Sequence, residues 1–235
     1  MMKAAPPWVM ALFTLSLALN LWFAGVPDWR WIPAAIAGWY AADLLSGLTH
    51  MYMDYRPCTP GIGLDRVFHY AGSRESAEYI GMRDRVWAQI SPFERLVYDF
   101  KNHHPRPEAL GRRSFLVQIG STIMFVSLPF SILVNLVCLV FPAAGWLVAG
   151  IVVLMIGGTL AQYFHGTLHR SDNPWIVLAM RRARLLMSPG AHALHHETLR
   201  RDFATNNGWS NPLVNLLFRI ATRQGWLSEA GLEPR

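Results

Sequence analysis

The sequence is poor in charged residues and in cysteine. Of its 235 residues, 15% are charged, against about 25% in an average soluble domain, and 52% are apolar. The apolar content excludes an intrinsically disordered chain, and two cysteines exclude a disulfide-rich scaffold. The low charge also disfavours an ordinary soluble enzyme, so the length points to a compact multi-pass membrane protein.

The longest uncharged stretch lies in the second half of the chain. The 56 residues between Arg113 and Arg170 include no Asp, Glu, Lys or Arg. One membrane-crossing helix needs about 20 apolar residues, so this stretch holds two such helices. Phe141-Pro142 separates them and predicts a very short turn, so the two helices should form a hairpin.

Four apolar runs predict an all-α integral membrane protein, with four transmembrane helices and a cytoplasmic, histidine-rich, metal-binding cap in one domain over residues 1–235. The first run is long for a cleaved signal peptide and no cleavage site follows it, so we expect it to remain as a membrane helix. Pro129 is expected to kink the third helix. The expected spans are about 8–26, 31–53, 115–141 and 143–164.

Basic residues predict which side of the membrane each segment faces. Ten of the 21 Lys and Arg residues lie within 55–113 and nine within 165–235, which four spans place on the same side as the N-terminus. The positive-inside rule assigns that side, and both termini, to the cytoplasm. The net charge of +6 is therefore attributed to basic residues that set the membrane orientation, and not to nucleic-acid binding. The compact size, the scarcity of lysine and the lack of a transit peptide suggest a bacterial inner membrane.

Two segments outside the spans predict further helices. Ser91-Pro92-Phe93-Glu94 is typical of a helix start, with proline at the first helical position. Residues 174–187 combine three arginines with Trp, Ile and Leu, which predicts an amphipathic helix. Such a helix either lies in the lipid headgroup layer or packs on the protein's own core.

Histidine is the residue on which the functional prediction depends. Nine histidines occur, and eight fall in four groups along the chain, whereas His69 stands alone. The predicted topology places all four groups at or just below the same membrane surface, where ionisable residues are costly and tend to be functional. The eight predicted metal ligands are His50, His103, His104, His165, His169, His192, His195 and His196.

The spacing within the groups favours shared ligands. His50 and Asp54 are four residues apart, as are His165 and His169, so each pair lies on one face of a helix. The three histidines within 192–196 are also spaced so that all can face one point. Asp54 is the predicted catalytic carboxylate, and it either binds a metal or orients a neighbouring histidine.

Other acidic and amide residues have weaker claims to the site. Asp43 lies inside the second expected span and is predicted to have a structural partner, either Ser46 or the fourth span. Asn206, Asn207 and Trp209 are expected to close the site from below. Three further acids are candidates for hydrogen bonds to the metal ligands: Asp99, Glu197 and Asp202.

The type and number of ligands limit which metal ions the site suits. Neutral imidazole suits Zn, Cu, Fe and Ni, and eight nitrogens are enough for two ions with open positions left over, whereas one structural zinc needs four ligands. No H-E-x-x-H motif supports a zincin protease, and paired b-type haems would need axial histidines inside the spans. A pair of iron ions is the best match, because iron supplies the redox change that C–H cleavage needs and zinc does not.

These motifs resemble the lipid desaturase family that includes plasmanylethanolamine desaturase, its bacterial CarF relatives and the chloroplast palmitate desaturase. Order and internal spacing agree in all four motifs, and the similarity covers about residues 31–217. The motifs are residues 42–50 with Asp54, residues 100–104 with Pro107, residues 165–169, and residues 192–196 followed by Asn207-Gly208-Trp209 and Asn211-Pro212.

The resemblance implies a four-helix membrane fold, a histidine-bound di-iron centre and the oxygen-dependent introduction of a double bond into a lipid chain. No G-x-G-x-x-G motif follows a predicted strand, so the electrons are expected from a separate carrier such as a ferredoxin or a cytochrome b5-like protein. The expected partners are thus a membrane lipid, O2 and this carrier. Ether phospholipid, acyl phospholipid and free or thioester-linked fatty acid remain open as substrates.

Two departures from the family pattern stand out. The chain has 48 residues between Asp54 and His103, more than the family has, so part of residues 58–92 looks like an insertion. It could be a lid, a surface for docking a partner, or a neutral excursion. Ala191 stands where relatives often have another histidine.

Two other functions fit the same residues. A membrane hydroxylase would use the same metal centre and end in a C–OH group. A non-catalytic metal or haem protein of the membrane would use the histidines without oxygen chemistry, and a haem would give a Soret band.

Overall fold

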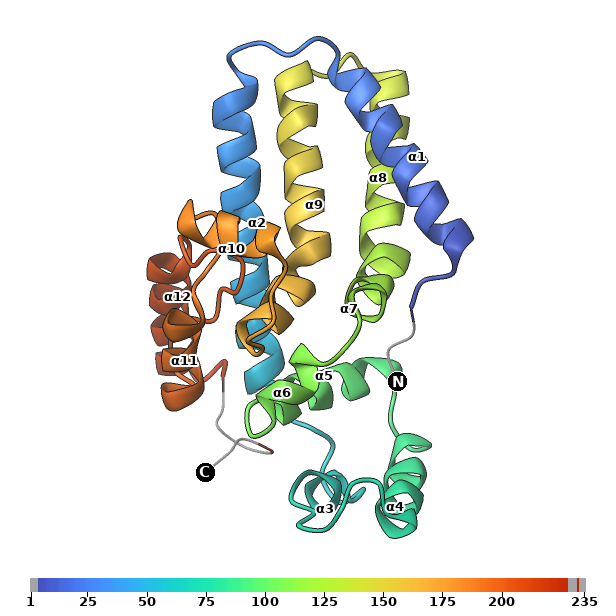
Figure 1. Ribbon diagram of the computed structural model, residues 1–235, viewed down its shortest axis with the longest axis vertical. Helices are drawn as coiled ribbons and strands as arrows, with labels where there is room; N and C mark the ends of the chain where they lie inside the picture. Colours follow the sequence, from blue (N-terminus) through green and yellow to red (C-terminus); the bar gives the residue numbers. More distant parts are fainter. Residues whose placement is uncertain (1–3, 228–231, 233–235) are drawn as a thin grey trace.

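The computed structural model describes residues 4–227 and 232, and these form helices with no strand among them. Helices occur at all four expected spans: α1 (Pro7–Ala24), α2 (Trp31–Tyr55), a long helix made of α7 (Phe115–Thr122), η1 (Ile123–Ser127) and α8 (Leu128–Val140), and α9 (Gly145–Leu168). Figure 1 shows them running side by side, with α9 between α2 and α8.

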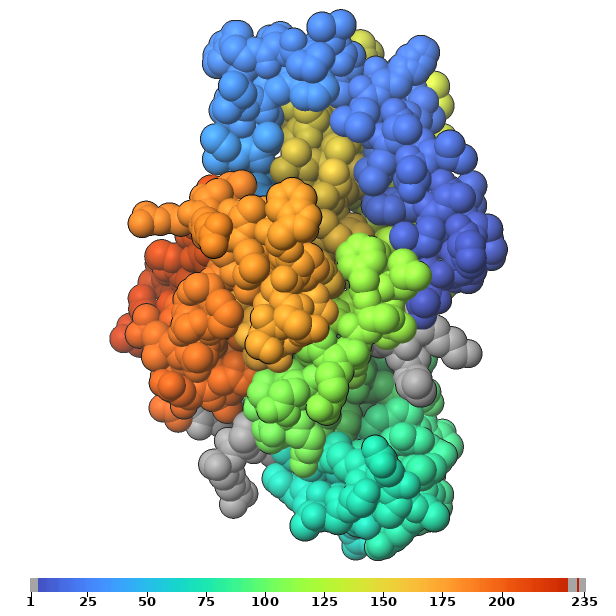
Figure 2. Space-filling view, in the orientation of Figure 1, coloured from blue at the N-terminus to red at the C-terminus, as the bar shows by residue number. Residues whose placement is uncertain are grey.

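The other helices lie at one end of this bundle and along its side (Figure 1). They are α3 (Leu64–Phe68), α4 (Ala77–Trp87), α5 (Pro92–His103), α6 (Pro107–Gly111), α10 (Trp175–Arg182), α11 (Pro189–Thr198) and α12 (Asn211–Arg223). The predicted helix start at Ser91 is confirmed, since its side chain accepts a hydrogen bond from the Glu94 N–H. In the space-filling view the α3–α4 segment forms a separate lobe at the lower end (Figure 2).

Three helices among the described residues are long and apolar enough to cross a membrane: α1, the continuous helix over 115–140, and α9. Their outer faces expose large apolar side chains such as Trp22 and Leu139, which lipid tails cover without cost. The helix α2 is 25 residues long, but Asp43 and the polar residues near its end lower its mean hydropathy. The membrane character is therefore shown for three of the four expected spans.

The helices α2 and α9 approach each other closely because small residues face each other. A Cβ atom at Gly38 would lie 2.2 Å from the carbonyl oxygen of Gly150, and one at Gly157 would lie 2.6 Å from a side-chain carbon of α2. Small residues are the usual device for close packing of membrane helices, where apolar surface alone gives no preference for a neighbour. The close packing brings His50 of α2 and His165 of α9 to the same end of the bundle.

A buried polar cluster holds α1 against α8. The Ser131 hydroxyl lies 2.7 Å from the Ser16 hydroxyl and also donates to Asn20 Oδ1 at 2.7 Å, and Asn135 Nδ2 donates to the Ser16 carbonyl at 3.0 Å. All four residues are buried. In an apolar environment no water is present to bond such groups, so the hydrogen bonds between them favour this one arrangement of the two helices.

The helix over 115–140 contains a π-helical turn, Ile123–Ser127, directly before the expected kink at Pro129. Proline has no N–H to donate, and its ring clashes with the carbonyl group four residues earlier in a regular α-helix. A wider turn at this place relieves that clash. The Ser127 hydroxyl then lies 2.7 Å from the Thr159 hydroxyl, which joins this turn to α9.

The segment that follows α9 is fastened to the middle of α2 by Asp43. The two oxygens of this buried carboxylate accept hydrogen bonds from the N–H groups of Asn207, Gly208 and Ser210 and from the Ser210 hydroxyl, at 2.7–3.0 Å. The predicted partners, Ser46 or the fourth span, are wrong: the Ser46 hydroxyl donates only to the backbone carbonyl of Asp43. No spacing pattern predicts that the 207–210 turn contacts the middle of α2.

We predict that Asp43→Ala destabilises the protein. The substitution leaves four donors of the 207–210 turn without their acceptor, which should lower the free energy of unfolding by roughly 3 kcal/mol. The melting temperature, followed by circular dichroism in detergent, should fall by about 6–12 °C. Asp28→Ala removes an exposed carboxylate that pairs with Arg30 and should leave the melting temperature unchanged. Equal melting curves for the two variants would contradict the assigned role of Asp43.

Candidate metal centre

All eight predicted histidines and Asp54 converge at the lower end of the bundle. They come from the ends of α2, α5 and α9 and from α11, four elements far apart in the sequence. His69 is exposed and belongs to neither group of ligand atoms. The four sequence groups therefore meet at one place, as their spacing and depth predicted.

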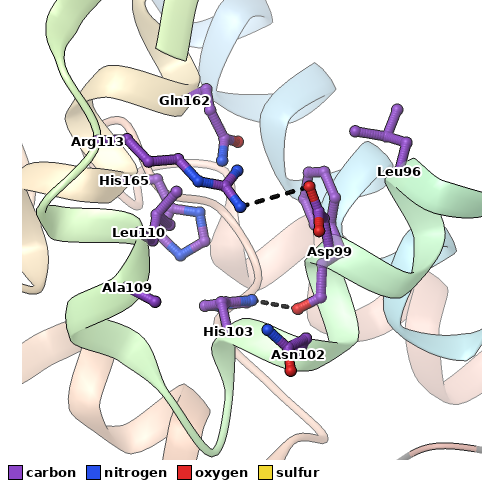
Figure 3. A pocket seen from close by; sticks show the side chains of 10 residues that line it. Leu96, Asp99, Asn102, His103, Ala109, Leu110, Arg113, Gln162 and His165 are labelled. Carbon is purple, nitrogen blue, oxygen red and sulfur yellow. Dashed lines mark hydrogen bonds and ion pairs between the residues drawn. The ribbon is translucent and has the colours of Figure 1, made fainter. Parts of the chain in front are cut away.

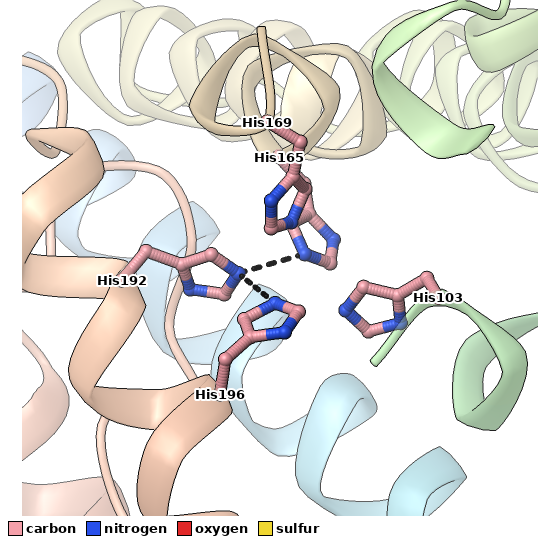
Figure 4. Close-up of side chains that lie close together, drawn as sticks. All are labelled: His103, His165, His169, His192 and His196. Carbon is pink, nitrogen blue, oxygen red and sulfur yellow. Dashed lines mark hydrogen bonds between the residues drawn. The ribbon is translucent and has the colours of Figure 1, made fainter. Parts of the chain in front are cut away.

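Five histidines form the first group, which we call the five-histidine cluster: His103, His165, His169, His192 and His196. Each offers one ring nitrogen, and these nitrogens all lie within 4.8 Å of one another. The closest pairs join the Nε2 atoms of His165 and His192 at 3.0 Å, and of His192 and His196 at 3.2 Å. Figure 4 shows the five rings turned toward a common centre.

Asp54 and three histidines, His50, His104 and His195, form the second group, which we call the Asp54 cluster. Oxygens of Asp54 lie 3.3 Å from His50 Nε2 and 3.4 Å from the Nε2 atoms of His104 and His195. These separations are longer than the roughly 2.7–2.9 Å of a charge-assisted hydrogen bond. They suit atoms that surround a common ion. The two clusters adjoin, because the rings of His103 and His104 are only 4.2 Å apart.

Backbone carbonyl groups orient three of the rings. His50 Nδ1 lies 2.9 Å from the Phe203 carbonyl oxygen, His195 Nδ1 lies 2.9 Å from that of Arg201, and His103 Nδ1 bonds that of Phe100. A carbonyl oxygen only accepts, so Nδ1 carries the proton in each ring. The Nε2 atom is then unprotonated, and its lone pair points into the cluster.

Several of these ligand atoms have no hydrogen-bond partner although they are buried. They are the Nε2 atoms of His50, His103 and His169 and both side-chain oxygens of Asp54. Buried polar atoms without a partner are rare in folded proteins. Ligands about 2.1 Å from one ion lie about 3.0–3.4 Å from their neighbours, which matches the spacings found here. Each cluster therefore fits a metal ion, and imidazole-rich sets suit Zn, Cu, Fe or Ni.

Burial keeps four of the histidines outside the spans neutral: His103, His169, His192 and His196. Loss of water contact, reinforced by neighbouring histidines, lowers the pKa of His103 and His192 well below the usual range. The same causes lower the pKa of His169 to about 4 and that of His196 to about 2. A neutral ring keeps one nitrogen lone pair for a metal, whereas a protonated ring has none.

A large apolar cavity of about 630 Å³ reaches the two clusters, with His50 and His165 in its wall. It lies between α2, the η1 turn and α9, and Leu96 and Phe100 of α5 bound its lower end. Along α9 its lining extends over 154–165, a length of about 16 Å at 1.5 Å per residue.

The wall of this cavity includes side chains that are exposed at the outer surface of the spans. Leu45 of α2 is 52% exposed, and Phe125 and Val126 of the η1 turn are 74% and 61% exposed. The cavity therefore opens sideways between α2 and η1, toward the side that lipid tails would occupy.

A second, small cavity of about 20 Å³ is lined by His103 and His165 (Figure 3). It is large enough for one water molecule. Asp99 lines it and forms an ion pair with Arg113 at 3.3 Å. Burial raises the pKa of Asp99. Asp99 thus pairs with an arginine and bonds none of the clustered histidines.

The remaining residues expected near the site lie elsewhere. Asn206 Nδ2 donates to the Gly157 carbonyl at 3.2 Å and so braces α9, and Trp209 is 41% exposed. Glu197 is exposed, and Asp202 bonds Asn215. The expectation that 206–209 closes the site from below is therefore wrong, because Asp43 holds this stretch higher along α2.

Two residues at the centre went unrecognised in the sequence. Lys101 is 1% exposed, and its ammonium group donates to the Asp54 carbonyl, which ties α5 to the end of α2. Phe203 is fully buried and packs its ring against His195, with 4.9 Å between ring centroids. One signal for Lys101 was available: it is one of only two lysines in the chain and directly precedes Asn102 and the histidine pair.

Residues 91–222, more than half of the chain, match the lipid desaturase domain. The chain belongs to the lipid desaturase family. It is also 25% identical, over 230 residues, to a protein from Myxococcus xanthus named plasmanylethanolamine desaturase, and the match covers 94% of this chain and 69% of that protein. No solved structure matches the chain. Family membership supports lipid desaturation as the activity and a lipid as the substrate.

We predict that His192→Ala removes metal from the five-histidine cluster. Its Nε2 atom lies within 3.2 Å of two other ligand nitrogens, so its loss opens one side of the site. Metal content by mass spectrometry, after dialysis against a chelator, should fall by at least one ion per chain relative to the unaltered protein. His69→Ala is the matched control and should retain all bound metal. Full metal content in His192→Ala would contradict the assignment.

Proposed function

We propose that the protein is an oxygen-dependent lipid desaturase that holds one iron ion in each of the two clusters. The observation that carries this proposal is the position of the two clusters at the end of an apolar cavity, in a chain of the lipid desaturase family. Bound iron would supply the oxygen activation and redox change needed to remove hydrogen from two adjacent methylene groups.

The protein's own side chains would fix the geometry of this centre. The ring orientations set by the Phe203, Arg201 and Phe100 carbonyl groups aim three Nε2 atoms before any metal arrives. For Asp54 we favour the ligand role over the orienting role. Its oxygens lie beside Nε2 atoms, the nitrogens that face the cluster, whereas an orienting carboxylate would bond Nδ1.

The large cavity is the proposed site of the lipid chain. Its walls are mostly apolar, so a lipid chain that moves from the bilayer into the cavity stays in apolar surroundings. The sideways opening between α2 and η1 favours a lipid that enters from the bilayer over a water-soluble thioester. The plasmanylethanolamine desaturase relative makes an ether phospholipid the first substrate to test.

We propose a topology of four membrane crossings, with α2 as the additional one and both termini in the cytoplasm, all in one domain over residues 1–235. The helix α2 lies beside α9, which is itself apolar enough to span. For the amphipathic helix α10 we favour a place in the lipid layer. It buries only Val177 and leaves Trp175 and Ile176 exposed, and the Trp39 indole bonds the Leu185 carbonyl beside α2.

Electrons are proposed to come from a separate carrier on the cytoplasmic side, such as a ferredoxin or a cytochrome b5-like protein. The cytoplasmic segments hold 19 of the 21 basic residues, and a basic surface steers an acidic carrier. The bacterial relative agrees with a bacterial inner membrane as the proposed location.

The test uses protein purified after growth with ample iron. We expect about two irons per chain, no Soret band, and a double bond in an ether or acyl phospholipid only when O2, a reduced ferredoxin and the protein are combined. Omitting O2 should abolish the product. Stoichiometric haem, or absence of a redox metal, would overturn the di-iron proposal, and a hydroxylated product would show the alternative outcome of the same centre.

We predict that enlarging Gly158 blocks the lipid site. Gly158 lines the cavity, and a Cβ atom there meets nothing within 4 Å, so larger side chains grow into empty space. Desaturation, measured as product lipid by mass spectrometry, should decline little in Gly158→Ala and at least about tenfold in Gly158→Phe, with unchanged metal content. Leu139→Phe, at an exposed position outside the cavity, is the control. Full activity in Gly158→Phe would place the lipid chain elsewhere.

A further inference from the structure

The lobe formed by residues 58–90 has an apolar core of its own. Leu64, Phe68, Tyr79 and Val86 are buried together, and Tyr98 of α5 and Leu232 join the same cluster. This is the stretch that looks like an insertion between the first two histidine groups. It stands outside the spans in Figure 2 and yet packs on the helix that carries the second histidine group.

One arginine of this lobe joins it to the metal centre. Arg74 donates to four acceptors: the Val67 and Phe68 carbonyl groups at 3.2 and 3.0 Å, the Tyr79 hydroxyl at 3.0 Å, and Asn102 Oδ1 at 3.2 Å. The first three acceptors belong to the lobe, and the fourth belongs to the last turn of α5. The guanidinium group is therefore a rigid bridge from the lobe to α5.

A second arginine bonds the same amide oxygen. Arg106 donates to Asn102 Oδ1 at 2.9 Å and to the Phe68 carbonyl at 3.0 Å. Two guanidinium groups therefore share two acceptors. Like charges this close repel, so the arrangement depends on the shared oxygens between them. Both arginines therefore contact α5 through the side chain of Asn102.

Asn102 directly precedes the two histidines that join the clusters. His103 belongs to the five-histidine cluster and His104 to the Asp54 cluster. The α-helix ends at His103, and helix ends leave backbone groups unpaired and fray. A small rotation of this last turn would move one ligand of each cluster at once.

We propose that Arg74 is a positioning residue for the metal centre. It acts through Asn102, so that the lobe over 58–90 is a scaffold that fixes His103 and His104. The proposal rests on the proposed function in that both histidines bind metal. Partners behind the ligands of known metal sites typically contribute about 10–100-fold to metal affinity. The alternative role as a docking surface for a charged partner is less favoured, because the surface of the lobe carries charges of both signs, such as the Arg83–Asp84 pair.

The test is a titration of metal-free protein with Co²⁺, whose absorption bands report ligand geometry. Arg74→Ala and Asn102→Ala should each weaken binding of at least one ion by about 10–100-fold and alter its absorption bands. Because Arg74 acts through Asn102, the double variant should bind no more weakly than the weaker single variant. Arg74→Lys should restore part of the affinity. Arg83→Ala, in the same lobe, is the control and should match the unaltered protein.

The outcomes separate this inference from the proposed function. If the unaltered protein binds no Co²⁺ or iron, the proposed function fails. If it binds two ions and Arg74→Ala binds them with equal affinity and equal spectra, the positioning role is wrong. Additive losses in the double variant would overturn the path through Asn102. If Arg74→Ala does not fold, the Co²⁺ affinities of Asn102→Ala and Arg74→Lys are compared with that of the unaltered protein, at matched melting temperatures. Unchanged affinity in both variants would then show that the positioning role is wrong.

Discussion

Nitrogen lone pairs that face one another across a few ångströms repel, and the lower end of this molecule is built around that repulsion. Eight imidazoles and one carboxylate aim their acceptor atoms inward, and buried atoms such as His50 Nε2 and both Asp54 oxygens have no donor to relieve them. A cation bound at each cluster would turn this repulsion into attraction. The binding free energy would then also hold α2, α5, α9 and α11 together, because ligands that come from separate elements couple metal binding to folding.

The scaffold brings the ligands together by packing that involves no metal. Glycine contacts let α2 and α9 approach until His50 and His165 share one end of the bundle. Asp43 pulls the 207–210 turn against α2, and the carbonyl groups of the adjoining 201–203 stretch then reach two of the rings. The same α2–α9 packing leaves the apolar cavity on its open side. The positions of the ligand residues and the shape of the cavity therefore depend on one helix pair.

Sequence patterns predicted the parts of this design that are local or periodic. Long apolar runs gave four helices close to their expected bounds, and spacings of three and four residues marked histidines that share a helix face. Two features went unpredicted: the division of the ligands between the two clusters, and the contacts between distant segments. The adjacent residues His103 and His104 enter different clusters, because side chains one residue apart on a helix diverge. The partner of Asp43 and the link from Arg74 to Asn102 connect segments 28 or more residues apart, for which one sequence offers no spacing rule.

The division of ligands along the chain has a consequence for how the protein is made. Residues 192–196 supply three of the histidines, and the carbonyl groups that orient His50 and His195 come from Phe203 and Arg201. A nascent chain that already holds its membrane helices therefore still lacks a complete set of ligands in either cluster. Loading of a metal would therefore wait until residues 192–203 have been synthesised, after all four long helices, and a chain stalled before that point would enter the membrane without a site able to capture a redox metal.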